Sequence, residues 1–554
     1  MNIQRPNRKN ATSPYEKPER RRRARSRAAY STRRSGPRYW SDFPVRIVVD
    51  SQGHETIYDG IARDVSDGGL LIESRDVPPD TQRVRLRFEV PVGILPEEYI
   101  HGSVDIAAEV RRHDAAKAYW GMQFVEPLSR RLARSTWAVL RWTAISLLSA
   151  AIVFTLVLKY KNYQFFWFDA PLFFYSILVG GYLISRFAFA AFYRNPPPRA
   201  DTPPVTLIIP AHNEEAQIER TLRQAMNLEY PADKLQVVVI DDGSTDGTLA
   251  AIQRARDLYP EVELIHYGKS RGKRHALSDG VRRSTGAFIV FIDSDSFLET
   301  DAIRRLLDHF ADPEVAAVTG HCDVENVWTN ALTKMQSVRY YVAFRVMKAA
   351  ESVFDSITCL SGPLACYRRE RLLEVLDAWE HQTFLGRPAT FGDDRSLTNL
   401  LLRRGHKVRY AEKAQCTTVV PEDHRTFLRQ QLRWKRSWFR ESLVACLFMW
   451  KKQPLMALSF YLGFLLPLVA PIVVLRALVL VPLLQSVWPI NYLAGVLVMS
   501  AMVSSVYLLV KRSRLWLYGV MFCFYYMFIL VWQLPIAVLT FAETGWGTRS
   551  KSEI

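Results

Sequence analysis

Residues 237–246 read VVVIDDGSTD, a short apolar run that ends abruptly in acidic and small polar residues. Four consecutive β-branched residues predict a buried strand, and the Asp-Asp-Gly-Ser that follows predicts a turn at its carboxyl end. Similar apolar runs occupy Val205–Pro210 and Phe288–Ile292, and Glu214–Met226 has helical spacing. This alternation predicts a doubly wound α/β domain over residues 200–430, with ligands at the carboxyl ends of its strands.

Charged residues follow each of these predicted strands. Asp242 ends the 237–240 strand, Lys273 lies in a basic turn before a helix, and Asp293-Ser294-Asp295 ends the third strand. Two carboxylates at this spacing suit a divalent cation, Mg²⁺ or Mn²⁺, that bridges a diphosphate. Each signal alone has a plain alternative: a loop carboxylate, an Asx-turn or a solvated lysine. Their occurrence at successive strand ends favours a nucleotide site.

A second polar cluster lies within residues 382–442. Asp393 and Asp394 sit in a Gly-led loop, and Gln430-x-x-Arg433-Trp434 precedes a segment rich in Trp and Arg. A positioned carboxylate can act as a general base, and two adjacent carboxylates can raise the pKa of one of them. A guanidinium matches phosphate geometry, whereas Trp434 can also be an aromatic anchor at a membrane interface. The cluster predicts chemistry at a membrane surface.

Membrane segments account for much of the apolar content. The chain has 554 residues, 49% of them hydrophobic, and the apolar runs gather where they are long enough to cross a bilayer. Two transmembrane helices are predicted within 137–193, and further spans within 455–541. The individual segments are Trp137–Leu158, Phe166–Phe192, 455–484, 487–510 and 515–541.

Charge predicts which side of the membrane the other parts occupy. The net charge is +17, and basic residues are denser on the outer flanks of the first two spans than between them, where Lys159 and Lys161 lie. The positive-inside rule then places the regions before and after this pair in the cytoplasm. Binding of a nucleic acid polymer is the rival explanation of the charge, and the predicted spans argue against it. The six cysteines form no CxxC pair and are expected to stay reduced, and no cleaved secretion signal is expected.

The first 130 residues divide into a tail and a small β domain. Residues 1–33 are rich in Arg, Lys, Pro and Ser, so we expect a disordered basic tail, either solvated or in contact with lipid headgroups. Within 34–130 apolar and polar residues alternate, as in Pro44–Val49 and Val84–Val90, which predicts strands. A small antiparallel barrel fits this pattern.

Two motifs give the β domain a family resemblance. Arg34-x-x-x-Arg38 precedes the first strand, Asp64-x-Ser66-x-x-Gly69 lies in a turn, and Tyr119–Phe124 reads as a closing strand. This arrangement resembles a PilZ domain. The resemblance implies a cyclic di-GMP site, with arginines on phosphates and guanines and the second motif facing base edges; a barrel that binds no nucleotide is the alternative. The implied residues are Arg33, Arg34, Arg38, Asp64, Ser66 and Gly69.

The strand-end motifs resemble the nucleotide-sugar domain of family 2 glycosyltransferases, which has the GT-A fold. From residue 319 on, the likeness narrows to bacterial hyaluronan synthases and rhizobial chitin-oligosaccharide synthases, and it covers roughly 130–549. It rests on these stretches: Thr319-Gly320-His321, Ser361-Gly362-Pro363-Leu364, Gly392-Asp393-Asp394-Arg395, Gln430–Trp434 and Trp546-Gly547-Thr548-Arg549. Such synthases usually lack a PilZ domain, which leaves another exopolysaccharide open as the product.

The transferase resemblance implies a role for each polar cluster. A carboxylate deprotonates the acceptor hydroxyl, a metal and an arginine stabilise the leaving UDP, and a C-terminal segment closes over the nucleotide. The implied residues are Asp242 for uridine, Lys273 for the diphosphate, Asp293 and Asp295 for the metal, Asp394 (with Asp393 as the alternative) for the base, Gln430 and Trp434 for the acceptor end, Arg433 for UDP, and Trp546 and Arg549 for the lid.

The segment after the transferase domain raises a topological question. Residues 431–452 are predicted to form an amphipathic interfacial helix, with a partner-binding helix as the alternative. Three straight spans after it would put residues 542–554, which contain Trp546, on the opposite side from the nucleotide. The 455–484 run contains Pro471 and Pro482, so a fold-back there is the alternative.

The two resemblances together imply a multi-pass protein of the cell inner membrane, with PilZ and transferase domains in the cytoplasm. The implied activity is processive, inverting polymerisation of a UDP-sugar with export of the polysaccharide, activated by cyclic di-GMP. GlcNAc alone, as in chitin, and GlcNAc with GlcA, as in hyaluronan, stay open. Two further alternatives are a nonprocessive transferase acting on a lipid carrier and a cyclic di-GMP receptor with an inactive transferase domain; the intact Asp394 and Gln430–Trp434 motif argue against them.

Overall fold

The structure is a computed structural model that describes residues 38–543 apart from 52–53, 67, 90–102, 115–117, 487, 512 and most of 129–169. The chain forms two compact units, Met1–Trp137 and Ala138–Ile554. Four sets of predictions lie outside the described residues: the basic tail with Arg33 and Arg34, most of the first span, Trp546 and Arg549.

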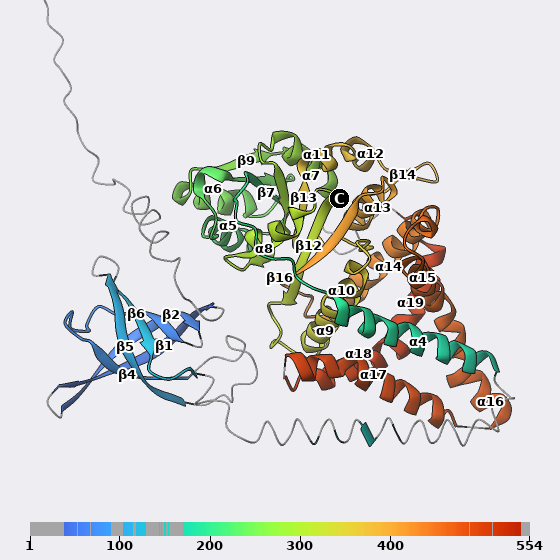
Figure 1. The fold of residues 1–554 in the computed structure, drawn as a ribbon, viewed down its shortest axis with the longest axis horizontal. Coiled ribbons are helices and arrows are strands. Elements are labelled where there is room, and N and C mark those ends of the chain that lie inside the picture. Colours follow the sequence, from blue (N-terminus) through green and yellow to red (C-terminus); the bar gives the residue numbers. More distant parts are fainter. Residues whose placement is uncertain are drawn as a thin grey trace, which may run out of the picture. The chain divides into compact units, whose positions relative to one another are not determined.

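The first unit is a closed antiparallel barrel in the order β1-β2-β3-β6-β5-β4 (Figure 1). Its strands are β1 (Arg38–Ser51), β2 (His54–Ser66), β3 (Gly69–Glu73), β4 (Arg83–Glu89), β5 (Ser103–Asp114) and β6 (Tyr119–Phe124). The predicted alternation sends every second side chain of β4 inward. Ile47, Leu86 and Trp120 fill the core, and Trp120 Nε1 donates to Ser74 O at 3.0 Å. The predicted small barrel is confirmed.

The second unit is built on an eight-stranded mixed sheet in the order β11-β16-β12-β13-β10-β7-β8-β9. Its strands are β7 (Val205–Ala211), β8 (Leu235–Asp241), β9 (Val262–His266), β10 (Phe288–Phe291), β11 (Ser296–Leu298), β12 (Val315–Val324), β13 (Ala365–Arg368) and β16 (Lys407–Thr418). The predicted strands β7, β8 and β10 are parallel neighbours, so their carboxyl ends meet at one edge. A short hairpin, β14 (Thr383–Phe384) and β15 (Arg387–Pro388), lies outside this sheet.

Helices cover both faces of this sheet (Figure 1). The helices of this part of the chain are α5 (Ile218–Met226), α6 (Thr248–Leu258), α7 (Lys273–Arg283), α8 (Ala302–Leu307), α9 (Ala331–Val342), α10 (Ala349–Ser352), α11 (Arg369–Leu373), α12 (Leu376–Glu380), α13 (Asp393–Arg403) and α14 (His424–Cys446). The helix predicted over residues 431–452 overlaps α14, which starts earlier and ends at Cys446; a short 3-10 turn at Met449–Lys451 follows. Helix α14 begins at His424 because Asp423 caps it, accepting a hydrogen bond from Thr426 N at 2.8 Å.

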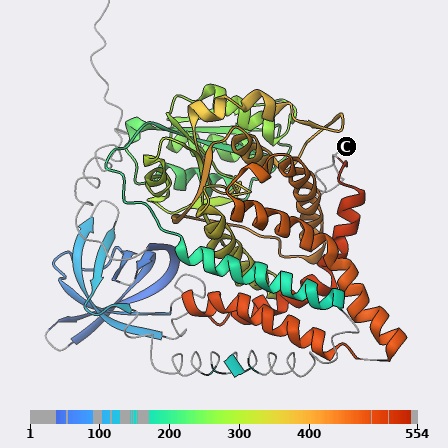
Figure 2. The ribbon, with the colours of Figure 1, turned by 45° about the vertical axis from the view of Figure 1, so that its right-hand side comes forward.

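Apolar helices follow and precede the transferase sheet. They are α4 (Ala170–Phe192), α15 (Pro454–Leu475), α16 (Val481–Gln485), α17 (Ile490–Val510), α18 (Trp516–Phe528) and α19 (Gln533–Leu539). Among the described residues, Phe173–Phe192, Pro454–Gln485 and Tyr492–Val510 are long and apolar enough to span a membrane, and α18 with α19 forms a pair bent by 43°. Figures 1 and 2 show α4, α17 and α18 running side by side along one side of the domain.

The described chain ends beside the transferase domain. Phe541 packs against Phe384 and Phe439, with ring centres 5.8 and 5.5 Å apart, and Glu543 pairs with Arg436 at 2.6 Å. The sequence alternative placed a fold-back in the 455–484 run, but the sharp bend falls between α18 and α19. Residues 541 and 543 therefore lie against α14, and residue 541 also lies against the β14–β15 hairpin.

Candidate functional site

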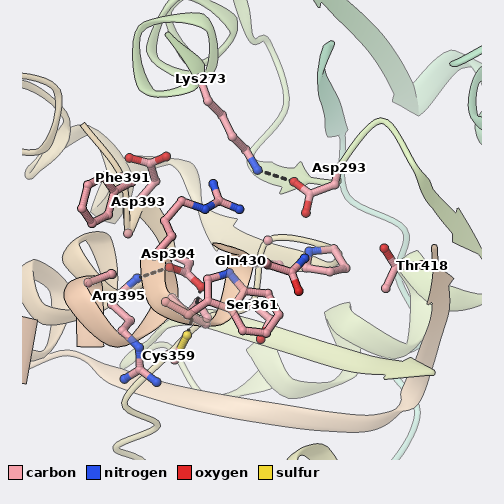
Figure 3. Close-up of a pocket in the computed structure, with 18 of the residues that line it drawn as sticks. Lys273, Asp293, Cys359, Ser361, Phe391, Asp393, Asp394, Arg395, Thr418 and Gln430 are labelled. Carbon is pink, nitrogen blue, oxygen red and sulfur yellow. Dashed lines mark hydrogen bonds and ion pairs between the residues drawn. The ribbon is translucent and has the colours of Figure 1, made fainter. Parts of the chain in front are cut away.

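A large pocket of about 1100 Å³ lies at the carboxyl edge of the transferase sheet. Residues from the strand ends, from the start of α13 and from α14 line it, as Figure 3 shows. Its lining extends to Gly463 and Pro467 of α15 and to Leu534 of α19. The predicted nucleotide and acceptor clusters therefore face one cavity that reaches the apolar helices.

Lys273, Asp293 and Asp295 form one wall of the pocket. Lys273 is the first residue of α7, and its ammonium group pairs with the Asp293 carboxylate across the cavity (Figure 3). Burial, and next the charge of Asp293, raise the pKa of Asp295 to about 6. Thr418 donates to Asp295 from 3.4 Å. A basic and an acidic group are thus held together where the sequence predicted the diphosphate.

The donor set of this wall fits a divalent cation bound together with a nucleotide. Two neighbouring carboxylates suit a hard cation, which would neutralise the charge of both. Among the residues that the structure describes, no group of three His, Cys, Asp or Glu side chains could hold a metal alone. Mg²⁺ and related ions commonly use one or two carboxylates and take the remaining ligands from phosphates and water. Asp293 and Asp295 would hold such an ion.

Asp242 shapes the loop beside Lys273. Its carboxylate accepts hydrogen bonds from Ser270 Oγ at 2.7 Å, from Arg271 N at 2.7 Å and from Gly272 N at 3.0 Å. These bonds fix the backbone that leads into α7. The residue lines the pocket, as predicted, and its contact with uridine stays a prediction.

Asp394 faces the pocket from the first turn of α13. Its Oδ1 accepts from Arg395 N at 2.8 Å, and its Oδ2 lies 3.1 Å from the thiol Sγ of Cys359 (Figure 3). Burial, and next the Asp394 charge, raise the pKa of the Cys359 thiol to about 12, so this thiol remains a hydrogen-bond donor. These two contacts orient the Asp394 carboxylate, and neither of them is an ion pair with a cation. Such an arrangement suits a proton acceptor.

Asp393 has different surroundings. Its carboxylate pairs with Arg274 at 2.9 Å, and the two side chains are only 10% and 7% exposed. Arg274 also donates to Trp379 O at 2.9 Å and to Gln382 Oε1 at 3.2 Å. The pair joins α7 to α13, so it connects the helix that carries Lys273 to the helix that carries Asp394.

A close contact fixes α13 against α14. Gly392 precedes α13 with φ +80°, and a Cβ there would lie 1.9 Å from Ser437 Oγ. Beside this contact Glu441 accepts from Arg440 Nε at 3.0 Å and from Asn399 Nδ2 at 3.1 Å. Arg440, which lies within the predicted amphipathic helix, is buried among these partners.

The Gln430–Trp434 motif lies in the middle of α14, and its three predicted residues line the pocket. Gln430 points into the cavity near Asp394 (Figure 3), and its buried Oε1 has no hydrogen-bond partner among the described residues. The guanidinium of Arg339 lies 5.6 Å from the Trp434 ring centre. A buried acceptor without a partner and an aromatic face suit a bound sugar.

Sequence reasoning assigned no role to Cys359, Arg339 or Lys435, although all three line the pocket. Cys359 lies two residues before the Ser361–Leu364 motif, and that proximity is a signal for it. Arg339 and Lys435 come from helices far apart in the chain; Lys435 directly follows the Gln430–Trp434 motif, and that proximity is a signal for it. The predicted residues Trp546 and Arg549 lie outside the described part.

The barrel brings several predicted positions to one end. In the strand register Arg38 is opposite Ser66, and Ser66 is opposite Gly69. Ser66 and Asp64 are each 7% exposed, and Ser66 Oγ donates to Gly69 O at 3.2 Å. A Cβ at Gly69 would lie 2.2 Å from Met122 O, so this position needs glycine. The backbone of three neighbouring strands therefore converges where the motifs predicted a ligand.

Comparisons with known proteins agree with this geometry. Residues 203–437 match the family described as glycosyltransferase like family 2, and residues 32–138 match the PilZ domain. The chain is 30% identical over 389 residues to a hyaluronan synthase of Streptococcus pyogenes, covering 69% of this chain and 91% of that synthase. The chain belongs to the family 2 glycosyltransferases of the hyaluronan synthase type. It joins such a transferase to a PilZ domain and to candidate membrane helices, as predicted.

Two further similarities were found. An N-acetylglucosaminyltransferase of Rhizobium sp. (strain N33) is 40% identical over 247 residues, which is 44% of this chain and 54% of that protein. A mannosyltransferase from Pyrobaculum calidifontis, solved in complex with GDP-Man and Mn²⁺, covers 68% of this chain and is itself covered fully, with 23% identity and a TM-score of 0.48. The candidate membrane helices and the likeness to the hyaluronan synthase support a membrane protein.

Proposed function

We propose that the protein is a processive, inverting synthase that polymerises UDP-GlcNAc, alone or with UDP-GlcA, and exports the polysaccharide across the cell inner membrane. The observation that carries the proposal is the continuity of the pocket, whose lining extends from the Asp293–Asp295 carboxylates to the apolar helices α15 and α19. A chain that grows beside those carboxylates would have a way toward the membrane without leaving the enzyme.

The chemistry assigned to the pocket is a single displacement. The acceptor hydroxyl oxygen forms a bond to the anomeric carbon, the bond from that carbon to UDP breaks with its electron pair leaving on UDP, and Asp394 takes the hydroxyl proton. Cys359 and the Arg395 N–H hold the Asp394 carboxylate in position. Lys273 and Arg433 bind the diphosphate, and a bound divalent cation supplies electrostatic stabilisation of the leaving group.

Asp393 takes no proton in this scheme. Its contact with Arg274 supports a role in positioning α13, because that ion pair is buried and joins two helices of the site. Gln430 and Trp434 hold the acceptor end, and Trp546 and Arg549 close over the nucleotide.

We assign cyclic di-GMP as the activator, bound at the barrel end where Arg38, Asp64, Ser66 and Gly69 meet in the strand register, together with Arg33 and Arg34. The PilZ match supports this assignment.

Labelled donors test the proposal directly. Full-length protein in lipid nanodiscs is incubated with Mg²⁺ or Mn²⁺, cyclic di-GMP and labelled UDP-GlcNAc, with and without UDP-GlcA. The expected product is a high-molecular-weight, enzyme-degradable glycan. Transfer of one sugar to lipid, or release of free sugar alone with every donor mixture, would refute the polymerase.

A further inference from the structure

The chain segment that carries Cys359 is held by two charged side chains that the reaction described above does not use. Lys348 is the last residue of a π-helix over Ala343–Lys348, and Glu351 lies in α10, which directly continues that helix. Residues three positions apart on a helix lie on the same face. Both side chains line the pocket, and Lys348 is only 9% exposed.

The partners of these side chains are two consecutive residues of an irregular segment. Residues 357–364 belong to no helix or strand, so side chains have to satisfy backbone polar groups there. Glu351 Oε2 accepts from Thr358 N at 2.8 Å, and Thr358 Oγ1 donates to both carboxylate oxygens of Glu351 at 3.1 Å. The ammonium group of Lys348 donates to Cys359 O. Charge-assisted hydrogen bonds of this kind are roughly twice as strong as neutral ones, so one helix face fixes the Thr358–Cys359 backbone.

A fixed backbone at Cys359 sets the direction of its thiol. The Sγ lies 3.1 Å from Asp394 Oδ2. On the other side of Cys359, Leu360 N donates to Thr398 Oγ1 at 2.9 Å, and that hydroxyl donates to Asp394 O at 2.6 Å. The segment 358–360 therefore connects to Asp394 both at its carboxylate and at its backbone.

We propose that Lys348 and Glu351 are positioning residues for the base, because they hold the segment 358–360 so that the Cys359 thiol keeps the Asp394 carboxylate directed at the acceptor hydroxyl. The inference rests on the proposed function, in which Asp394 takes the acceptor proton. Lys348 and Glu351 take no proton themselves and act through Cys359. Their loss would leave the donor site in place and misdirect the carboxylate.

Steady-state kinetics of the full-length protein in nanodiscs test the proposal. We expect Glu351→Ala to lower kcat for GlcNAc incorporation by about 10–100-fold, since misplacing a reacting group by about 1 Å can cost about 10²-fold. The KM for UDP-GlcNAc and the Kd for UDP should stay within about twofold of wild type, because the variant affects the transition state alone. Glu351→Gln keeps an acceptor oxygen for Thr358 N and should recover most of the rate. Lys348→Met should behave like Glu351→Ala, and Lys348→Arg should recover most of the rate.

A double variant distinguishes positioning through the thiol from an independent effect. If Glu351 acts through Cys359, the variant Cys359→Ala/Glu351→Ala should lose far less rate than the product of the two single losses, because contacts within one network are not additive. A matched control is Glu370→Ala, since Glu370 is an exposed acidic residue of α11 that does not line the pocket. It should keep the kcat of wild type.

Three results would count against these assignments. A wild-type kcat in Glu351→Ala, or a double-variant loss equal to the product of the single losses, would overturn the proposal. A loss of UDP affinity that matches the loss of kcat in both Glu351 variants would assign the side chain to the donor site or to the fold, and would also overturn it. Failure of wild type to transfer any sugar from UDP-GlcNAc would instead refute the proposed function.

Discussion

Asp393 and Asp394 are neighbours in the chain, but their carboxylates meet different groups. Asp394 faces the pocket and accepts from a thiol and a backbone N–H. Asp393 is paired with Arg274 in a nearly water-free contact. A carboxylate held in a buried ion pair is a poor proton acceptor, because taking the proton would leave the guanidinium unpaired. The structure thus supports a division of roles between the two carboxylates, with Asp394 as the proton acceptor and Asp393 as part of a buried ion pair.

This division predicts that Asp393 contributes to stability. Asp393→Ala should lower the free energy of unfolding by about 3–5 kcal/mol, because it leaves the Arg274 guanidinium buried without its partner. Arg274→Met should have a similar effect, and the double variant should lose less than the sum of the two. Thermal unfolding in detergent measures all three. Asp394→Asn is the control and should shift the midpoint little; a larger shift for Asp394→Asn than for Asp393→Ala would refute the assignment.

At the scale of elements, the site depends on how α13 and α14 pack. The backbone of Gly392 approaches Ser437 so closely that no side chain fits between the helices. Through this contact Asp394, at the start of α13, keeps its place opposite Gln430 of α14.

A pair of glycines tests the close contact. Gly392 and Gly386 both have positive φ, 80° and 74°, but only Gly392 would place a Cβ against another atom. Both alanine variants carry the backbone strain of a positive φ. The difference between their free energies of unfolding therefore reports the contact with Ser437 alone. Gly392→Ala should be less stable than Gly386→Ala by about 1–3 kcal/mol, the usual cost of overpacking. Equal unfolding midpoints would contradict the account, and Ser437→Gly should partly restore Gly392→Ala.

The elements that could be predicted from sequence are those with strong local signals. The β-branched run before Asp241 predicted β8. Asp293 and Asp295 come directly after the strand β10, and they were predicted to lie near the end of β8 because the carboxyl ends of parallel strands meet at one edge. The burial of Arg440 and the encounter of Arg339 with Lys435 could not be predicted in this way. Both depend on tertiary contacts between segments far apart in the chain, and a basic residue on an amphipathic helix looks the same whether it faces water or a pocket.

At the scale of the whole molecule, one chain joins a PilZ barrel, a transferase domain and apolar helices. The barrel residues that meet in the strand register are the position proposed above for cyclic di-GMP. An activator bound there would raise the transferase rate by increasing the population of a more active conformation of the protein. This requires that the activator bind the more active conformation with higher affinity than the less active one.

Arg38 tests this regulatory role. Arg38→Ala should abolish stimulation of polymer synthesis by cyclic di-GMP and leave UDP affinity unchanged, since the residue belongs to the barrel. Arg46→Ala is the matched control, because Arg46 is an exposed arginine of the same strand β1. The readout is the rate of glycan synthesis across a cyclic di-GMP titration. A wild-type rate independent of the dinucleotide would refute activation.

The central claim is that the pocket at the strand ends forms glycosidic bonds with Asp394 as the base. The most direct measurement compares wild type with Asp394→Asn in nanodiscs, recording UDP binding and incorporation of labelled GlcNAc into polymer. We predict unchanged UDP affinity and a loss of incorporation by about 10²–10⁴-fold, the usual contribution of a general base. Incorporation by Asp394→Asn at the wild-type rate would contradict the account.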